Sequence, residues 1–215
     1  MTVKERLIVL TYTKIKDSAI VIHTISRSEG RRSFLVHLGK RSSLALFQPL
    51  SILEAEIRDN AKSELATATG FSAIFPLESL RTDPRKNAMV MFMAEVLYRS
   101  IRDGSGETFF YDWCEKSIVT LDFLKSDFSN YHILFLIELA REMGFAPTAA
   151  GIAPLAGTAY QDARELIILP FPEAMTLPLT GKRRSELCDV FIRYIAHHSE
   201  STLEIRSLGV LRELF

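Results

Sequence analysis

The chain has 215 residues, of which 47% are hydrophobic and 24% charged, and its 26 Lys and Arg residues balance 26 Asp and Glu. These values exclude disordered and fibrous proteins and suffice for one or two buried cores. No apolar run reaches the length of a membrane span, and two cysteines cannot build a disulfide framework, so we expect a cytosolic protein.

The charge is unevenly distributed along the chain. Residues 1–45 carry nine Lys and Arg against three acids, and the remaining residues carry the opposite excess. Clustered bases favour a polyanionic partner, because Lys and Arg attract phosphates and release condensed counterions. The split also predicts two domains.

The first third of the chain is predicted to be β-structure. Short β-branched or alternating runs are separated by turn-forming residues. The runs cover residues 7–10, 19–25, 33–38 and 53–57. Several short strands at this spacing predict a small barrel, and a five-stranded barrel of this size is the oligonucleotide-binding (OB) architecture. We therefore predict an OB-like, DNA-binding domain over residues 1–80.

After Asp83 the apolar period becomes helical. Asp83 is a predicted N-cap, Pro84 suits the first turn, and Gly144 is a predicted C-terminal cap. The predicted helices cover residues 86–102, 108–125, 128–143, 182–198 and 202–214. Residues 147–180 are rich in Ala, Gly and Pro and are predicted to be irregular, with at most a brief strand at 166–169. The fold class is therefore α+β, with an all-α domain over residues 81–215 and the helix at 128–143 at its centre.

Five motifs in chain order resemble the bacterial recombination mediator RecO. They are residues 14–21 (KIKDSAIV) leading to Thr24, Arg27 and Gly30; 39–43 (GKRSS); 48–54 (QPLSILE); 138–147 (ELAREMGFAP); and 207–214 (SLGVLREL). The resemblance covers nearly the whole chain. It implies an OB barrel, a helical C-terminal domain and a non-catalytic role in DNA repair and recombination.

The resemblance further implies that the protein binds single- and double-stranded DNA, anneals complementary strands and acts with RecR. Together they help to load recombinase onto strands coated by single-stranded DNA-binding protein (SSB). The resemblance also implies a contact between the helical domain and the acidic, apolar C-terminal tail of SSB, and a cytoplasmic, nucleoid-associated location.

One departure from the family concerns zinc. Many members follow the Pro of the fourth motif with a four-cysteine zinc module, but Pro147 is followed here by TAAG, and the next cysteine is Cys188. Zinc needs about four N or S ligands. We therefore predict a short form of the family without a metal site, and we predict no cofactor.

The candidate DNA-binding residues are the bases of the barrel region. They are Lys14, Lys16, Arg27, Arg31, Arg32, Lys40 and Arg41. The alternative is an ordinary solvated surface, since Lys and Arg are nearly always exposed. Few aromatic residues are available there for base stacking, so we expect salt-dependent binding to the DNA backbone with little sequence preference.

A partner pocket for an acidic and aromatic tail would need an apolar hollow rimmed by bases, and Arg99, Arg102 and Arg141 are the candidates. The Met-rich segment at 89–93 could form a groove, although Met at helical spacing is usually core. The rival function is a protein-interaction adaptor that does not bind DNA. No constellation of nucleophile, base and oxyanion donors stands out, so we predict no enzyme.

The histidines and cysteines are predicted to have no catalytic or metal-binding role. His197 and His198 are predicted to lie at a helix C-terminus, which their partial positive charge favours. His132 is predicted to lie on an exposed face. Cys114 and Cys188 lie beside apolar residues on helical patterns and are predicted to be buried and structural.

Overall fold

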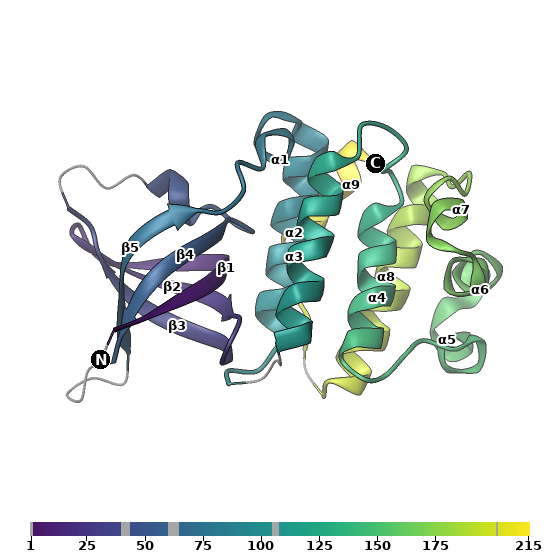
Figure 1. The fold of residues 1–215 in the computed structure, drawn as a ribbon. Helices are drawn as coiled ribbons and strands as arrows, with labels where there is room; N and C mark the ends of the chain where they lie inside the picture. Colours follow the sequence, from purple (N-terminus) through teal and green to yellow (C-terminus); the bar gives the residue numbers. More distant parts are fainter. Residues whose placement is uncertain (1, 40–43, 60–64, 105–107, 201) are drawn as a thin grey trace.

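The computed structural model describes residues 2–39, 44–59, 65–104, 108–200 and 202–215, and it consists of a β-barrel followed by a bundle of helices (Figure 1). The barrel strands are β1 (Thr2–Lys16), β2 (Ala19–Ser26), β3 (Gly30–His37), β4 (Ile52–Arg58) and β5 (Ala66–Ala73), with the 3₁₀ turn η1 (Leu44–Phe47) before β4. The predicted α+β fold class, with an N-terminal barrel and a helical C-terminal region, is confirmed.

The barrel closes in the order β1-β2-β3-β5-β4. All neighbouring pairs are antiparallel except β3 and β5, which run parallel with Phe34 opposite Ala66. The long strand β1 pairs with β4 through its first half and with β2 through its second half, with a register shift between Val9 and Thr11. Because the sheet closes on itself, these strands leave no free sheet edge.

Strand β1 is buried on both faces at its centre. Leu7 and Val9 belong to the core inside the barrel, whereas Ile8 and Leu10 belong to the core formed with the helices. A strand covered on both sides needs apolar residues at consecutive positions instead of alternating ones. The unbroken run at residues 7–10 therefore marks where the barrel meets the bundle.

The bundle has nine helices of more than one turn in the described part of the chain. They are α1 (Glu78–Thr82), α2 (Pro84–Ser100), α3 (Thr108–Phe123), α4 (Tyr131–Glu142), α5 (Ala149–Ala156), α6 (Tyr160–Ile168), α7 (Phe171–Met175), α8 (Gly181–His198) and α9 (Leu208–Leu214), with the 3₁₀ turn η2 (Gly157–Ala159) between α5 and α6. Helices α2 and α3 lie next to the barrel, and α5 to α7 lie at the opposite end of the bundle (Figure 1).

The predicted helix ends are confirmed in detail for two helices. Asp83 Oδ1 accepts hydrogen bonds from the backbone N–H of Arg85 at 2.8 Å and of Lys86 at 3.4 Å, and Pro84 is the first residue of α2. At the end of α4, Gly144 has φ +88° and its N–H bonds to Arg141 O at 2.9 Å. Helix α4 is buried along almost its whole length, as predicted for the central helix.

The prediction that residues 147–180 are irregular is wrong, and so is the brief strand at 166–169, because α5, η2, α6 and α7 occupy this segment. Thr148 caps α5 by accepting a hydrogen bond from Gly151 N at 3.1 Å. The buried stripe has helical spacing but is made mostly of alanine. It consists of Ile152, Ala156, Ala159, Ala163 and Leu166. Alanine is the strongest helix former, so a small-residue stripe here indicates closely packed helices.

Three smaller predictions also need correction. Strand β5 was not predicted, because its buried residues Ala66 and Ala68 are small. Helix α9 begins at Leu208, not at residue 202. His132 lies in the core at 1% exposure and not on an exposed face, because α4 is surrounded by other helices. No described helix is long and apolar enough to cross a membrane.

Candidate nucleic-acid interface

The turns of the barrel define two ends with different surroundings. The β1–β2 turn at residues 17–18 and the end of β3 at His37 lie at one end, since Lys16 pairs with Ala19 and Ala19 with His37. We call this the outer end, because it points away from the helices (Figure 1). The β2–β3 turn at residues 27–29 lies at the other end, where it contacts α3, and we call that region the junction.

Two of the predicted DNA-binding residues lie at the outer end. Lys14 and Lys16 are exposed on β1, and Lys14 Nζ lies 2.8 Å from Asp17 Oδ1. This hydrogen bond with Asp17 raises the pKa of Lys14, so the ammonium stays charged. Lys16 forms no ion pair with the described residues. Lys40 and Arg41 follow β3 in the sequence and lie outside the described residues.

Arg27 and Arg31 lie at the junction and contact the helical half. Arg27 makes a two-pronged contact with Asp112 of α3, with Nε 3.0 Å from Oδ1 and Nη2 3.2 Å from Oδ2. Arg31 Nε lies 3.0 Å from Asp103 Oδ1 without hydrogen-bond alignment, and its Nη1 donates to Ile101 O. The Arg31 guanidinium also lies over the Tyr98 ring, 4.5 Å from its centroid.

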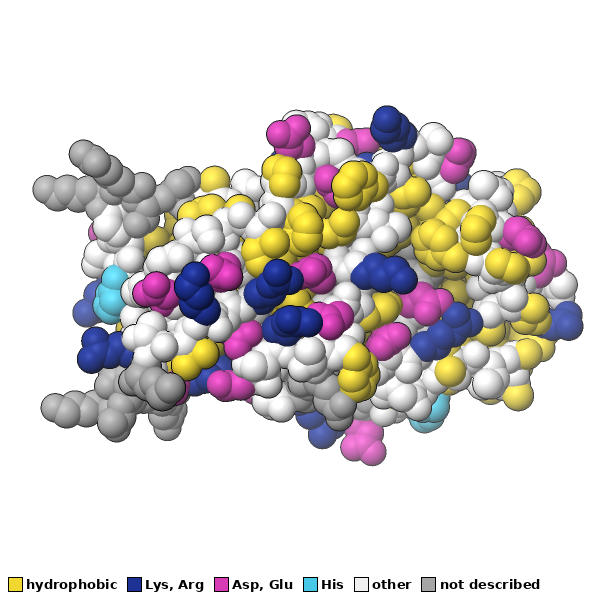
Figure 2. Space-filling model, in the orientation of Figure 1, with side chains coloured by type: hydrophobic (Ala, Val, Ile, Leu, Met, Phe, Trp, Pro, Cys, Tyr) yellow, Lys and Arg dark blue, Asp and Glu magenta, His cyan; other side chains and the backbone are white. Residues whose placement is uncertain are grey.

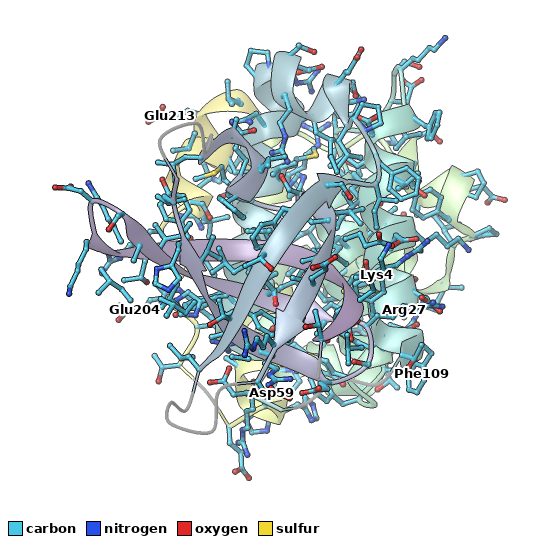
Figure 3. All side chains as sticks on the ribbon, turned by 60° about the vertical axis from the view of Figure 1, so that its left-hand side comes forward. Lys4, Arg27, Asp59, Phe109, Glu204 and Glu213 are labelled. Carbon is cyan, nitrogen blue, oxygen red and sulfur yellow. The ribbon has the colours of Figure 1, made fainter. Side chains whose placement is uncertain are left out.

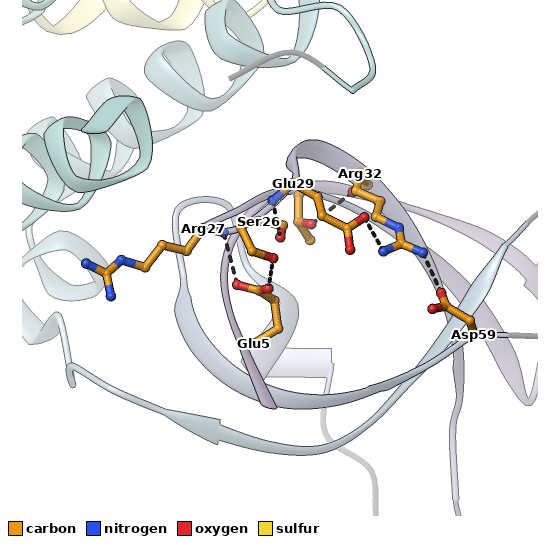
Figure 4. A network of polar contacts seen from close by, with 8 residues as sticks. Glu5, Ser26, Arg27, Glu29, Arg32 and Asp59 are labelled. Carbon is orange, nitrogen blue, oxygen red and sulfur yellow. Dashed lines mark hydrogen bonds and ion pairs between the residues drawn. The ribbon is translucent and has the colours of Figure 1, made fainter. Parts of the chain in front are cut away.

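Arg32 is held by carboxylates within the barrel itself (Figure 4). Its Nη1 donates to Glu29 and its Nη2 donates to Asp59 Oδ1 at 2.7 Å. The guanidinium lies over the ring of Phe34, which is buried. The structure thus separates the five described candidates into an outer pair, a junction pair and Arg32.

Arg58 is an exposed base of the barrel that the predicted DNA-binding residues do not include. Arg58 ends β4 opposite Thr2, near the chain start that Figure 1 places away from the helices. In the described residues Arg58 forms no ion pair. Arg58 lies beyond the basic excess of residues 1–45, although the closed barrel brings the end of β4 beside the start of β1. The signal in the sequence that indicates Arg58 is its position as a basic residue directly after the predicted strand at 53–57.

Aromatic side chains for base stacking are scarce on the described barrel surface. Phe34 and Phe47 are buried, whereas Tyr12 is 39% exposed on β1. Figure 2 shows Lys and Arg side chains interspersed with Asp and Glu across the junction. Contacts from this surface to nucleic acid would therefore be made mainly by cations, and more freely at the outer end, where fewer carboxylates neutralise them.

The three candidate partner-binding arginines lie at different places in the helical half. Arg99 lines a groove of about 790 Å³ between β1, α2 and α9. Arg102 lines a second hollow of about 540 Å³ beside the exposed Phe109, which is labelled in Figure 3. Arg141 lines neither, and bonds to Glu138 Oε1 at 2.5 Å and to Ile167 O at 2.9 Å.

The two hollows differ in charge. Glu142 and Glu200 line the hollow of Arg102 together with that arginine. The groove of Arg99 also contains Arg206, and its only lining acid among the described residues is Glu95. Burial raises the pKa of Glu95, but hydrogen bonds from Ser207, Arg206 N and Arg99 outweigh this effect and lower it. The α2–α9 groove is therefore apolar with two bases and one fully engaged acid.

The Met-rich segment divides between core and groove. Met89 and Met93 are completely buried, as is Phe92, whereas Met91 is 47% exposed and lines the α2–α9 groove. Val210 and Leu214 of α9 add exposed apolar surface on the opposite wall.

Histidines and cysteines offer no ligand cluster in the described part of the chain. Cys114 and Cys188 are buried and free, as predicted, and burial raises the pKa of both thiols. His197 and His198 lie in the last turn of α8, as predicted. Asn130, which sequence reasoning did not single out, donates from Nδ2 to three carbonyl groups around α7 and accepts from Arg184 Nε at 2.9 Å.

These features define a class of protein in which a closed, five-stranded OB-like barrel is joined to a helical bundle. Residues 1–76 match the family described as "Recombination protein O N terminal", and residues 81–151 match "Recombination protein O C terminal". The chain belongs to the RecO family. The resemblance seen in the sequence motifs is thereby confirmed.

Curated relatives match over nearly the full length of the chain. The DNA repair protein RecO of Bacteroides fragilis is 30% identical, over 97% of this chain and 97% of its own. The DNA repair protein RecO of Phocaeicola vulgatus is 30% identical over the same shares, and that of Flavobacterium psychrophilum is 26% identical over 100% of both chains.

Proposed function

We propose that the chain is a non-catalytic mediator of DNA repair and recombination that binds single- and double-stranded DNA and anneals complementary strands. Membership of the RecO family supports the repair and recombination role. The observation that carries the DNA-binding part is the outer end of the OB-like barrel, where Lys14 and Lys16 are exposed. A barrel end with little opposing charge is a suitable place for a phosphate backbone.

Annealing in this proposal follows from charge neutralisation. Two DNA strands repel each other because both are polyanions, and a cationic surface that holds both lowers this repulsion while the bases find their partners. Such a mechanism needs positioned Lys and Arg side chains and no covalent chemistry. It also needs little base stacking, which agrees with Tyr12 being the one exposed aromatic residue among the described residues of the barrel.

The proposal includes protein partners. With RecR, the protein would help to load recombinase onto SSB-coated DNA in the cytoplasm, at the nucleoid. The acidic, apolar tail of SSB would dock in the α2–α9 groove, because Arg99 and Arg206 face it there. The hollow beside Arg102 suits an acidic tail less well, since Glu142 and Glu200 would repel it.

A salt titration tests DNA binding at the outer end. Binding of labelled single-stranded DNA is measured from low to physiological salt for the parent, for Lys14→Gln/Lys16→Gln, and for the matched control Lys116→Gln/Lys125→Gln, whose lysines are exposed on and after α3. The outer-end variant should bind several-fold more weakly, with a salt slope reduced by about 0.7 for each lost phosphate contact. The control should retain the parental slope.

Annealing is scored in the same samples after addition of the complementary strand. Parental protein should accelerate duplex formation, and the outer-end variant should do so less. If the parent binds no DNA at low salt, the mediator proposal is wrong and the protein-interaction adaptor becomes the better hypothesis. Equal losses in the outer-end variant and in the control would reject the outer end as the DNA site.

A further inference from the structure

The junction carries three barrel arginines that face three acids of the helical half. Besides Arg27 with Asp112, Arg6 Nη1 lies 3.7 Å from Glu115 Oε1 and Arg31 Nε lies 3.0 Å from an oxygen of Asp103. The acids lie more than 70 residues away in the sequence, on or just before α3. The positive charge of the first 45 residues is therefore partly neutralised inside the molecule.

The Arg27–Asp112 pair differs from the other two in its exposure. The side chains are 44% and 49% exposed, so solvent and ligands reach both partners. Glu115 is only 19% exposed and Arg31 only 14%, which protects those pairs on one side. Figure 3 shows Arg27 beside the helical half and near Lys4, on the surface of the molecule.

The backbone of Arg27 is held in place by hydrogen bonds, whereas its guanidinium can exchange one anionic partner for another. The backbone N–H of Arg27 donates to Glu5 Oε1 at 3.2 Å (Figure 4). The Arg27 carbonyl accepts from Thr108 Oγ1 at 3.2 Å. Among the described residues, only the two carboxylate oxygens of Asp112 accept hydrogen bonds from the guanidinium. A guanidinium donates two parallel hydrogen bonds to a carboxylate or to a phosphate in the same two-pronged geometry.

We propose that Asp112 occupies on Arg27 the position that a DNA phosphate takes, and thereby sets the affinity of the barrel for DNA. This inference rests on the proposed DNA-binding function. When DNA is bound, a phosphate displaces the Asp112 carboxylate from the Arg27 fork, and the phosphate surface extends from the barrel to the junction. Without DNA, Asp112 keeps the fork occupied and so weakens attraction of the junction to other polyanions.

The size of the effect follows from the exposure of the pair. A solvent-exposed ion pair is weak, so its competition with phosphate is worth about two- to fivefold in affinity. In the parent, the displaced Asp112 carboxylate offsets part of the charge that the phosphate contact neutralises. Without this carboxylate the salt slope on single-stranded DNA should steepen, by at most about 0.7.

A double-mutant cycle separates this competition from the general loss of one negative charge. Single-stranded DNA binding is titrated with salt for the parent, Asp112→Asn, Arg27→Gln and the double variant. Asp112→Asn should bind two- to fivefold more tightly than the parent, with a steeper slope. In the Arg27→Gln background the same change should have an effect no larger than that of a remote neutralisation.

The control for a remote loss of negative charge is Glu138→Gln in α4. The Glu138 side chain is 39% exposed and pairs with Arg141, much as the exposed Asp112 pairs with Arg27. Thermal unfolding of each variant confirms that it is folded. The competition would be refuted if Asp112→Asn changed the DNA affinity equally with and without Arg27. It would also be refuted if Asp112→Asn left the affinity unchanged while the parent binds DNA. Either result would leave the proposed DNA binding intact. Absence of DNA binding by the parent would instead refute the proposed function, and with it this inference.

Discussion

His132 should make the stability of the fold depend on pH. The imidazole is buried in α4 at 1% exposure, between the rings of Phe92 and Phe215, and its Nδ1 has no hydrogen-bond partner in the described structure. Burial, and secondarily the positive charge of Arg184, lower the pKa of His132 to about 3. The folded protein therefore holds this histidine neutral.

The sign of the effect follows from proton linkage. In the unfolded chain a histidine binds a proton near its ordinary pKa of about 6.5, so below that pH the unfolded state holds the extra proton. Stability contributed by the neutral ring is complete above about pH 6.5 and is lost progressively as the pH falls toward 3. At pH 5 the loss amounts to about 2 kcal/mol, from about 1.4 kcal/mol for each pH unit below 6.5.

Urea unfolding of the parent and of His132→Phe at several pH values between 7.5 and 5 measures this loss. The variant keeps an aromatic ring between Phe92 and Phe215 and cannot be protonated, so its free energy of unfolding should fall by about 2 kcal/mol less than that of the parent. His132→Leu gives a second reading if the larger ring packs poorly. His37→Gln is the control, because that ring is exposed at the end of β3. Parallel pH profiles for the parent and both His132 variants would refute the reasoning.

Two further predictions concern a helix end and the partner groove. Gly144→Ala should lower the free energy of unfolding by about 1 kcal/mol, because Gly144 has φ +88°, whereas Gly209→Ala in α9 should be neutral or slightly stabilising in the same urea assay. An equal effect of the two changes would exclude backbone strain as the cause. A labelled acidic peptide that ends in an aromatic residue should bind the parent and lose several-fold affinity with Arg206→Gln, and less with Arg102→Gln. The reverse order would move the partner site to the hollow beside Arg102.

Local signals in the sequence predicted the parts of the fold that depend on local chemistry. Asp83 and Gly144 mark helix ends through their own side chain or backbone freedom, and both were found. The unbroken apolar run in β1 was also visible, but its two-sided burial depends on where the bundle packs. Segments whose buried positions are alanines, such as α5, α6 and β5, were missed because alanine carries a weak hydrophobic signal.

The candidate site was harder to predict because its residues interact across long stretches of sequence. Asp112 and Arg27 are 85 residues apart, and nothing in either local pattern indicates that they meet. Asn130 likewise reads as an ordinary helix-start residue, although it is buried and connects α4 with α7 and α8. Charge counts along a chain ignore such pairings and so overestimate the free charge of a folded surface.

The neutral overall charge of the chain therefore has a structural explanation. At the junction the basic barrel and the acidic helices neutralise each other through Arg6, Arg27 and Arg31. Of these three ion pairs, Arg27–Asp112 is exposed on both sides, so it is weak and exchangeable. At the outer end Lys16 has no such partner in the described residues. A polyanion approaching the barrel would meet the outer end first and would reach the junction only by displacing carboxylates. In the proposed mechanism the outer end would therefore govern the encounter with DNA, and the Arg27–Asp112 pair at the junction would adjust the final affinity.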